Sequence, residues 1–214
     1  MKIAIISDIH GNLPALGATL ADIKKRNINK VICIGDIIGK GPNSSEAIDI
    51  CKNTCEYIIK GNWDDYISNN NESESVTWYR NQIGKDRLEF LRKLPHFIDF
   101  YLSGKLVRLF HAHPQSVYKR IFPNSPIEDR LAMFNISNQR GINAIEKEAD
   151  IVGYGDIHSP YLQNISGRIL FNVGSVGNPL DFTQSSYVIL EGNYGSEKND
   201  SFSIQFIRVP YDIE

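Results

Sequence analysis

The chain has 214 residues, of which 42% are hydrophobic and 22% charged, with a formal net charge of −2. This length suits one domain with a sizeable core, and the charge argues against strong electrostatic binding of nucleic acid. No apolar stretch is long enough to span a membrane, and no signal-peptide pattern opens the chain. Three cysteines, an odd number, indicate no disulfide framework. We therefore expect a cytoplasmic protein with no membrane segment.

The first twelve residues contain a short strand followed by metal-competent side chains. Residues 3–6 form an apolar, β-branched run, typical of a strand buried on both faces. Asp8 and His10 follow it directly, and a helical pattern begins at Leu13. Ligands of open α/β sheets bind just beyond the carboxyl ends of strands. A carboxylate and an imidazole two positions apart there suit a divalent metal ion.

The same unit of strand, polar end and helix recurs twice. A helix over residues 13–26 precedes a strand at 31–34 that ends in Asp36, and a strand at 57–59 ends before Asn62. Between them, Ser44 or Ser45 is expected to cap a helix that runs through residue 55. Connections of this length are typical of right-handed parallel crossovers, so the three strand ends should share one sheet edge.

The rest of the chain is expected to fold into the same single domain, residues 1–214, with a small helical cap segment at about 64–95. A polar run at 69–75 interrupts that segment, and a helix is predicted over 127–148. Further strands are predicted at 97–102, 106–110, 150–152, 161–165, 168–171, 187–190 and 202–209.

Five predicted strand ends carry side chains that can ligate a metal ion. These residues are Asp8, His10, Asp36, Asn62, His111, Asp156 and His158. A carboxylate such as Asp36 can bridge two cations, and two cations roughly 3.5–4 Å apart form the clamp used in phosphoryl displacement. The sequence therefore predicts a metal site that acts on phosphate esters.

Four motifs give this pattern a family resemblance. They are D-x-H-G-N at Asp8, G-D-x-x-G-x-G-P at Asp36, G-N-x-D at Asn62 and a late G-S-V-G-N-P segment from Gly174. With these motifs the chain resembles the calcineurin-like metallophosphoesterase superfamily, and within it a bacterial phosphodiesterase-type group. The resemblance implies a four-layer α/β/β/α sandwich of two mixed sheets flanked by helices.

The resemblance also implies two divalent metal ions, with Mn²⁺ expected and Fe, Ni or Zn as alternatives. Asp8, His10, Asp36 and His158 would hold the first ion. Asp36, Asn62, His111 and Asp156 would hold the second. Asp36 and Asn62 would thereby be catalytic, since a hydroxide activated by both ions attacks phosphorus.

Two positions depart from the family pattern. Trp63 stands where the family usually has a histidine near the leaving group, so basic leaving groups should react slowly. Asp156 replaces an expected histidine ligand, and its charge favours harder ions such as Mn²⁺. Asp156 is alternatively only a turn residue.

Further residues near these motifs have both a functional and a structural interpretation. His113 is a candidate substitute acid or an ordinary loop histidine. Asn12, Trp63, Lys119 and Arg120 are candidate substrate contacts. Asn12 can equally cap the helix at Leu13, and Trp63 can simply pack beside the site.

The sequence thus predicts a metal-dependent enzyme that hydrolyses a phosphodiester, a nucleotide or a phosphoanhydride. Its partner would be a small phosphorylated substrate, with neither a membrane nor strong nucleic-acid binding expected. Two alternatives stay open, a serine/threonine protein phosphatase and a non-catalytic metal-binding scaffold of the same fold. Nothing in the sequence indicates an oligomeric state.

Overall fold

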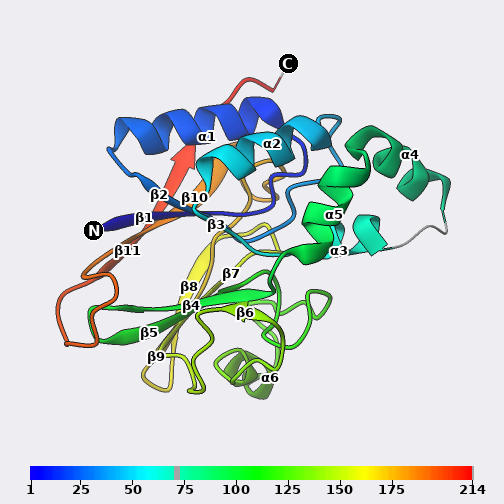
Figure 1. Cartoon of the computed structure of the whole chain (residues 1–214). Helices are drawn as coiled ribbons and strands as arrows, with labels where there is room; N and C mark the ends of the chain where they lie inside the picture. The colour runs from blue at the N-terminus through cyan, green and yellow to red at the C-terminus, as the bar shows by residue number, and fades with distance from the viewer. Residues whose placement is uncertain (70–72, 214) are drawn as a thin grey trace.

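Two β-sheets pack face to face in the computed structural model, which describes residues 1–69 and 73–213 (Figure 1). The first sheet has five strands in the order β11-β10-β1-β2-β3, with parallel pairing among β1, β2 and β3. Its strands are β1 (Lys2–Ile6), β2 (Lys30–Cys33), β3 (Tyr57–Ile58), β10 (Ser185–Glu191) and β11 (Ser203–Val209).

The second sheet has six strands in the order β6-β4-β5-β7-β9-β8. Pairing is parallel for β5 with β7 and for β7 with β9, and antiparallel for β4 with β5 and β8 with β9. The strands are β4 (Phe97–Leu102), β5 (Lys105–Phe110), β6 (Gly141–Ile142), β7 (Ile151–Tyr154), β8 (Tyr161–Ile165) and β9 (Arg168–Asn172). Both sheets are therefore mixed.

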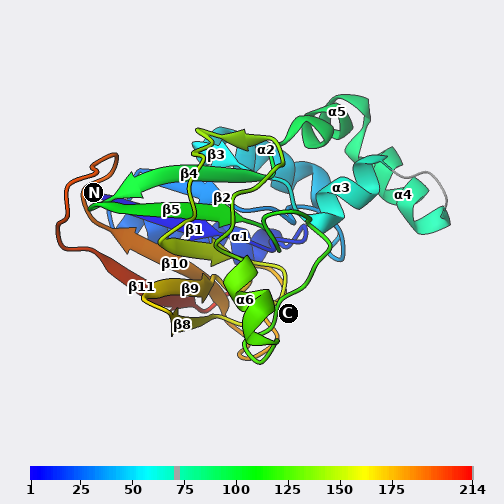
Figure 2. The ribbon, with the colours of Figure 1, turned by 90° about the horizontal axis from the view of Figure 1, so that it is seen from below.

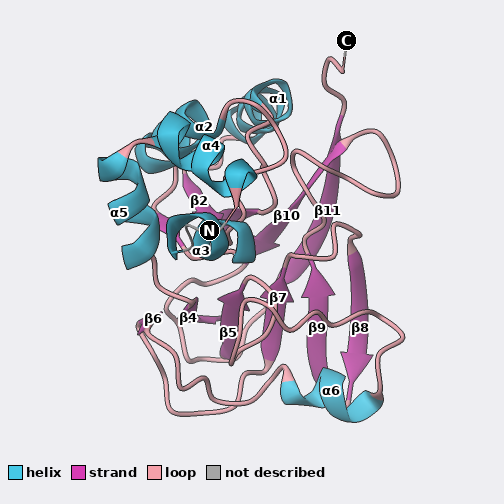
Figure 3. Ribbon diagram, turned by 90° about the vertical axis from the view of Figure 1, so that its right-hand side faces the viewer, coloured by secondary structure: helices cyan, strands magenta, loops and turns pink. Residues whose placement is uncertain are grey.

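Helices cover the outer faces of the two sheets. On the five-stranded sheet these are α1 (Leu13–Lys25) and α2 (Ser44–Thr54), and on the other sheet the short α6 (Ile127–Ala132) (Figure 3). The predicted α/β/β/α sandwich is confirmed. No helix among the described residues has the length and apolarity to cross a membrane.

Two hydrophobic cores follow from the alternation of side chains along the strands. In β1, Ile3 and Ile5 face the six-stranded sheet, and Ala4 and Ile6 face the helices. All four are fully buried. A strand buried on both faces reads as a continuous apolar run, which is why the sequence predicts β1 well.

The prediction of a helix over 127–148 is wrong beyond Ala132. After α6 the chain forms turns and the short strand β6 beside β4. The cause is Arg108, which is buried and forms a bidentate ion pair with Asp99. Its guanidinium also donates to the carbonyls of Asn135, Ile145 and Lys147. These bonds satisfy the loop's carbonyl groups outside any helix.

The predicted serine cap of α2 is also wrong. Asn43 is the N-cap residue, and its side chain makes no capping hydrogen bond. Ser44 Oγ instead accepts from the Gly39 N–H, and Ser45 Oγ donates to the Gln82 carbonyl. At α1, by contrast, Asn12 Oδ1 accepts from the Ala15 N–H, so the capping role proposed for Asn12 is confirmed.

Three helices gather at one end of the molecule (Figure 2). They are α3 (Asn62–Asn69), α4 (Glu74–Ile83) and α5 (Lys85–Lys93). They cover most of the segment predicted as a cap at about 64–95, whose role stays a prediction. The polar run at 69–75 lies partly outside the described residues.

Candidate metal centre

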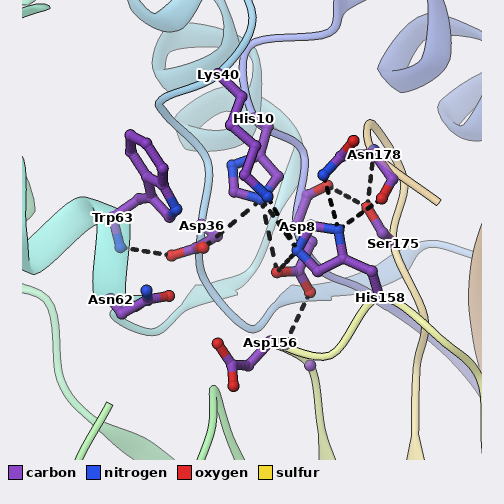
Figure 4. A network of polar contacts seen from close by, with 12 residues as sticks. Asp8, His10, Asp36, Lys40, Asn62, Trp63, Asp156, His158, Ser175 and Asn178 are labelled. Atoms are coloured by element: carbon purple, nitrogen blue, oxygen red, sulfur yellow. Dashed lines mark hydrogen bonds and ion pairs between the residues drawn. The ribbon is translucent and has the colours of Figure 1, made fainter. Parts of the chain in front are cut away.

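The predicted ligands come from neighbouring strand ends of both sheets. Asp8 and His10 follow β1, Asp36 follows β2, and Asn62 begins α3 just after β3. From the second sheet, His111 follows β5, and Asp156 and His158 follow β7. Figure 4 shows carboxylates and imidazoles from these segments turned toward one another.

The turns that carry these side chains have an uncommon backbone conformation. Asp8, His10, Asp36, Asp156 and His158 all have positive φ, between 49° and 66°. Non-glycine residues rarely adopt such angles, and clusters of them occur at functional sites. A glycine permits the close packing this requires, since a Cβ on Gly61 would lie 2.2 Å from the Asp36 nitrogen.

Three histidines are held so that the same ring nitrogen faces inward. The Nδ1 atoms of His10, His111 and His158 pair with the carbonyl oxygens of Ile38, Ile34 and Asn178, respectively. A carbonyl can only accept, so each Nδ1 carries the proton and each Nε2 keeps its lone pair. Such backbone contacts orient metal-binding histidines, so the three imidazoles fit a metal site.

Asp8 lies among these lone pairs. Its Oδ1 is 3.2 Å from His158 Nε2 and 3.9 Å from both His10 Nε2 and His111 Nε2. Within the described part of the chain, this buried oxygen has no hydrogen-bond donor. His10 Nε2 and His158 Nε2 are themselves only 3.2 Å apart. Acceptor atoms facing one another at such distances are explained by a cation between them.

Asp36 reaches both sides of the cluster. Its Oδ2 lies 3.7 Å from His10 Nε2, and its Oδ1 lies 3.4 Å from His111 Nε2. Asn62 is adjacent, and with its amide nitrogen turned inward it donates to Asp36 Oδ2 at 2.9 Å. With the oxygen turned inward instead, Asn62 Oδ1 joins the acceptors at 3.0 Å from His111 Nε2. That second orientation is the one a metal ion would require.

Two groups of potential ligand atoms result. One consists of Asp8, His10 and His158, and the other of Asp8, Asp36 and His111, and within each group the ligand atoms lie within 4.8 Å of one another. All are buried. The donor set of carboxylate oxygens and imidazole nitrogens suits Mn, Fe, Ni or Zn.

The electrostatics of the centre favour a cation. Burial lowers the pKa of His10 to about 4, so its imidazole is neutral near pH 7. Burial also opposes a charge on His111, but without a metal ion the negative charges of Asp36 and Asp8 outweigh it and raise its pKa well above the usual value. A proton then occupies Nε2, where a metal ion would otherwise bind. For Asp8, burial acts to raise the pKa, yet His158 and His111 lower it below the usual range. Asp8 thus stays ionised and attracts positive charge.

Asp156 is placed differently from the other predicted ligands. Its N–H donates to Asp8 Oδ2, and its carboxylate forms a bidentate ion pair with Arg120, with both N–O distances 2.9 Å. It belongs to neither group of ligand atoms. Arg120, expected to contact substrate, is therefore engaged by Asp156, and ligation by Asp156 stays a prediction.

Of the remaining predicted site residues, Trp63 contacts the centre, whereas Lys119 and His113 have their own partners. The Trp63 ring packs against Gly39 and makes an edge contact with the His10 ring, and the Trp63 backbone N–H donates to Asp36 Oδ1. Lys119 pairs with Asp129. His113 Nδ1 accepts from the Gln115 N–H, and no hydrogen bond or ion pair links His113 to the centre among the described residues. Roles of these residues with substrate stay predictions.

Two residues at the site are missing from the sequence prediction. Lys40 Nζ lies 3.5 Å from His158 Nε2, at the point where the chain leaves the Asp36 turn. Asp64 is fully buried and accepts from the N–H groups of Gly61, Asp36 and Ile37. Their signal was present, because both lie in the motifs that carry Asp36 and Asn62.

Asp64 should be essential to the turn that presents Asp36. In Asp64→Ala three buried N–H groups lose their acceptor, so we expect a loss of about 3 kcal/mol in the free energy of unfolding. Urea unfolding without added metal measures it, with the exposed loop variant Glu197→Ala as control. An Asp64→Ala protein as stable as this control would show that water replaces the carboxylate.

The protein is an α/β sandwich with two facing mixed sheets. A buried cluster of carboxylates and imidazoles lies at the strand ends, and this cluster makes it a metal-binding sandwich. The chain belongs to the calcineurin-like phosphoesterase superfamily, whose domain matches residues 1–194. It is 32% identical over 239 aligned positions to an uncharacterized protein of Methanocaldococcus jannaschii, covering 99% of this chain and 88% of that one.

Two solved structures share the fold. A metallophosphoesterase from Sphaerobacter thermophilus has a TM-score of 0.75 and 24% identity, covering 100% of this chain and 90% of the other. A hypothetical protein from Pyrococcus horikoshii has a TM-score of 0.79 and 20% identity, covering 99% and 89%. Family and fold together indicate a metallophosphoesterase.

Proposed function

We propose that the protein is a hydrolase that cleaves a phosphodiester, a nucleotide or a phosphoanhydride with the help of two divalent metal ions. The observation that carries the proposal is the convergence of three imidazole lone pairs on Asp8 and Asp36, within a family of phosphoesterases. Buried acceptor atoms in that arrangement serve no packing purpose and are costly without a cation.

The chain supplies the ligand geometry, and the ions would supply charge. Bound metals neutralise negative charge on the phosphoryl oxygens and lower the pKa of water. Asp36 faces both groups of ligands, so it is the candidate shared ligand. Asn62 stands beside it, held at the start of α3.

We further propose manganese as the preferred metal and the cytoplasm as the compartment. Asp8 and Asp36, from the five-stranded sheet, and Asp156, from the six-stranded sheet, place three carboxylates at neighbouring strand ends. Hard oxygen ligands of this kind favour Mn²⁺ over Zn²⁺. All three cysteines are free thiols, two of them buried, which fits a reducing compartment.

A non-catalytic scaffold and a protein phosphatase are the weaker alternatives. A scaffold has no need to keep three histidines in one tautomer around buried carboxylates. A protein phosphatase must act on a basic alkoxide leaving group, and Trp63 occupies the position of the expected acid. Aryl esters and phosphoanhydrides need less help of that kind.

Metal-dependent turnover of bis-p-nitrophenyl phosphate tests the proposal. We expect hydrolysis in the presence of Mn²⁺ and its complete loss on addition of excess EDTA. The attacking water needs a metal ion to lower its pKa, and the protein side chains alone do not supply that effect. Readdition of Mn²⁺ should restore the rate. No turnover with Mn²⁺, Fe²⁺, Ni²⁺ or Zn²⁺ would contradict the enzyme and favour the scaffold.

A further inference from the structure

A cavity of about 620 Å³ opens beside the metal centre. Its lining includes His10 and the exposed Lys40, which lie beside the metal centre, together with the turn at Gly41–Asn43, Asn178 and the C-terminal segment at Tyr211. This volume lies in the range of pockets that bind small molecules, and it far exceeds what a phosphate group fills. The cavity therefore has room for the organic part of a substrate.

Lys40 is held at the junction of the cavity and the centre. Its Nζ lies 3.5 Å from His158 Nε2 and 6.0 Å from the centroid of the Trp63 ring. In Figure 4 its side chain extends past His10, on the side away from Asp156. Lys40 has a φ of 59°, a value that side chains with a Cβ rarely adopt. Its backbone strain is explained if the ammonium group must be presented at this point.

Another part of the cavity lining comes from the C-terminal segment. Tyr211 is partly buried and packs against the core between the five-stranded sheet and its helices. It lies in the same cavity wall as Asp212, near the start of α1. An aromatic ring anchored in this way offers a flat apolar surface beside otherwise polar lining groups.

Three amide side chains, those of Asn12, Asn43 and Asn178, line the cavity. Asn43 begins α2 without using its side chain as a cap, so that amide is not committed to the helix. Asn178 lies on the other side, with Nδ2 3.1 Å from His158 Nδ1. The charges of Lys40 and Asp212 balance, so the lining as a whole is neutral, polar and partly aromatic.

We propose that this cavity binds the alcohol half of the substrate that stays on phosphorus during hydrolysis, and that Lys40 pairs with an oxygen of the phosphate. The ligand class is a phosphate ester of a neutral, polar, ring-bearing alcohol of about nucleoside size. Lys40 meets the charged phosphate beside the metal centre, Tyr211 contacts the ring, and the amides meet hydroxyl or ring-nitrogen groups. The cavity would bind such an ester whether or not the protein hydrolyses it; only the statement that the ester is a substrate rests on the proposed function.

Calorimetric titration of the Mn²⁺-loaded protein separates the two ends of the cavity. The probes are adenosine 5′-monophosphate and inorganic phosphate. Tyr211→Ala should weaken adenosine monophosphate about tenfold and leave phosphate within about twofold, because only the nucleotide has a ring to stack. Lys40→Met should weaken both about tenfold, since each loses a charge-assisted hydrogen bond. The exposed Lys198→Met is the control and should change neither.

Two more variants distinguish the loss of a ligand contact from misfolding of the protein. Tyr211→Phe retains the ring and should bind adenosine monophosphate like the parent. Asn43→Leu changes the opposite wall and should weaken the nucleotide but not phosphate. If both Tyr211→Ala and Asn43→Leu bind the nucleotide as tightly as the parent, the cavity is not the subsite. Binding that follows the expected pattern in a protein with no turnover would instead overturn the proposed hydrolysis and leave the subsite standing.

Discussion

Asp36→Asn should lose activity and metal together. Its two carboxylate oxygens face His10 Nε2 at 3.7 Å and His111 Nε2 at 3.4 Å, so one side chain serves both groups of ligands. An amide offers only one oxygen and no negative charge. We expect the rate on bis-p-nitrophenyl phosphate to fall by at least on the order of 10²- to 10³-fold, as for loss of a preorganised electrostatic contact.

Metal content measured by elemental analysis separates this effect from misfolding. The asparagine variant should bind no more than one ion per chain at Mn²⁺ concentrations that load the parent with two. Asp86→Asn, an exposed change on α5, is the control and should retain both ions. Two tightly bound ions and a parental rate in Asp36→Asn would disprove a shared carboxylate. Asp8, which belongs to both groups of ligand atoms, would then be the alternative bridge.

The strands and their polar ends were predictable because their signals are local. In β1 a buried apolar run stops at a polar turn within a few residues, and the spacing to Asp36 and Asn62 follows from parallel crossovers. The structure brings these ends together. Strand bounds differ by a residue or two, as for β3, which ends at Ile58 rather than residue 59.

The failures come from contacts between residues far apart in the chain. The loop that replaces the predicted helix after Ala132 depends on the buried Arg108 and Asp99 in β5 and β4. No local pattern in the loop sequence predicts that the guanidinium of Arg108 will donate hydrogen bonds to the loop's carbonyl groups. The ion pair of Arg120 with Asp156 joins residues 36 positions apart, so it too cannot be predicted from a local sequence pattern.

The sequence does not predict Lys40 as a site residue, for a different reason. It lies in the motif in which Asp36 is the residue that can ligate a metal ion, and a lysine between two glycines is ordinarily a solvated turn residue. Only the structure shows that Lys40 has a positive φ and that its ammonium lies 3.5 Å from His158 Nε2. The position of a flexible cation depends on backbone angles that its own sequence does not determine.

Asp156→Ala should weaken the second metal ion selectively. Asp156 lies two positions before His158, and its backbone N–H is tied to Asp8 Oδ2 at 3.1 Å, so it stands at the edge of the centre. If its carboxylate is a ligand, its loss should lower the affinity of one ion by at least about 10- to 100-fold, the range for outer contacts that support ligands. The first ion, held by Asp8, His10 and His158, should remain.

Asp156→His should keep two ions and change which metal activates. Imidazole suits Zn²⁺ and Ni²⁺ better than carboxylate does, so the activation profile should move from Mn²⁺ toward those ions. Stoichiometry and rate across Mn²⁺, Ni²⁺ and Zn²⁺ measure the change for the parent and both variants. An unchanged metal preference in Asp156→His would argue that position 156 never contacts the ion.

The ion pair with Arg120 gives this prediction its sharpest test. Arg120 engages both oxygens of Asp156 at 2.9 Å, so it competes with a metal for the same carboxylate. Arg120→Ala should therefore tighten the second ion, the opposite of Asp156→Ala, and the double variant should resemble Asp156→Ala alone. If the only role of Asp156 is to hold Arg120, both single variants should instead change metal affinity alike. Two ions bound as tightly in Asp156→Ala as in the parent would leave Asp156 as the partner of Arg120 and nothing more.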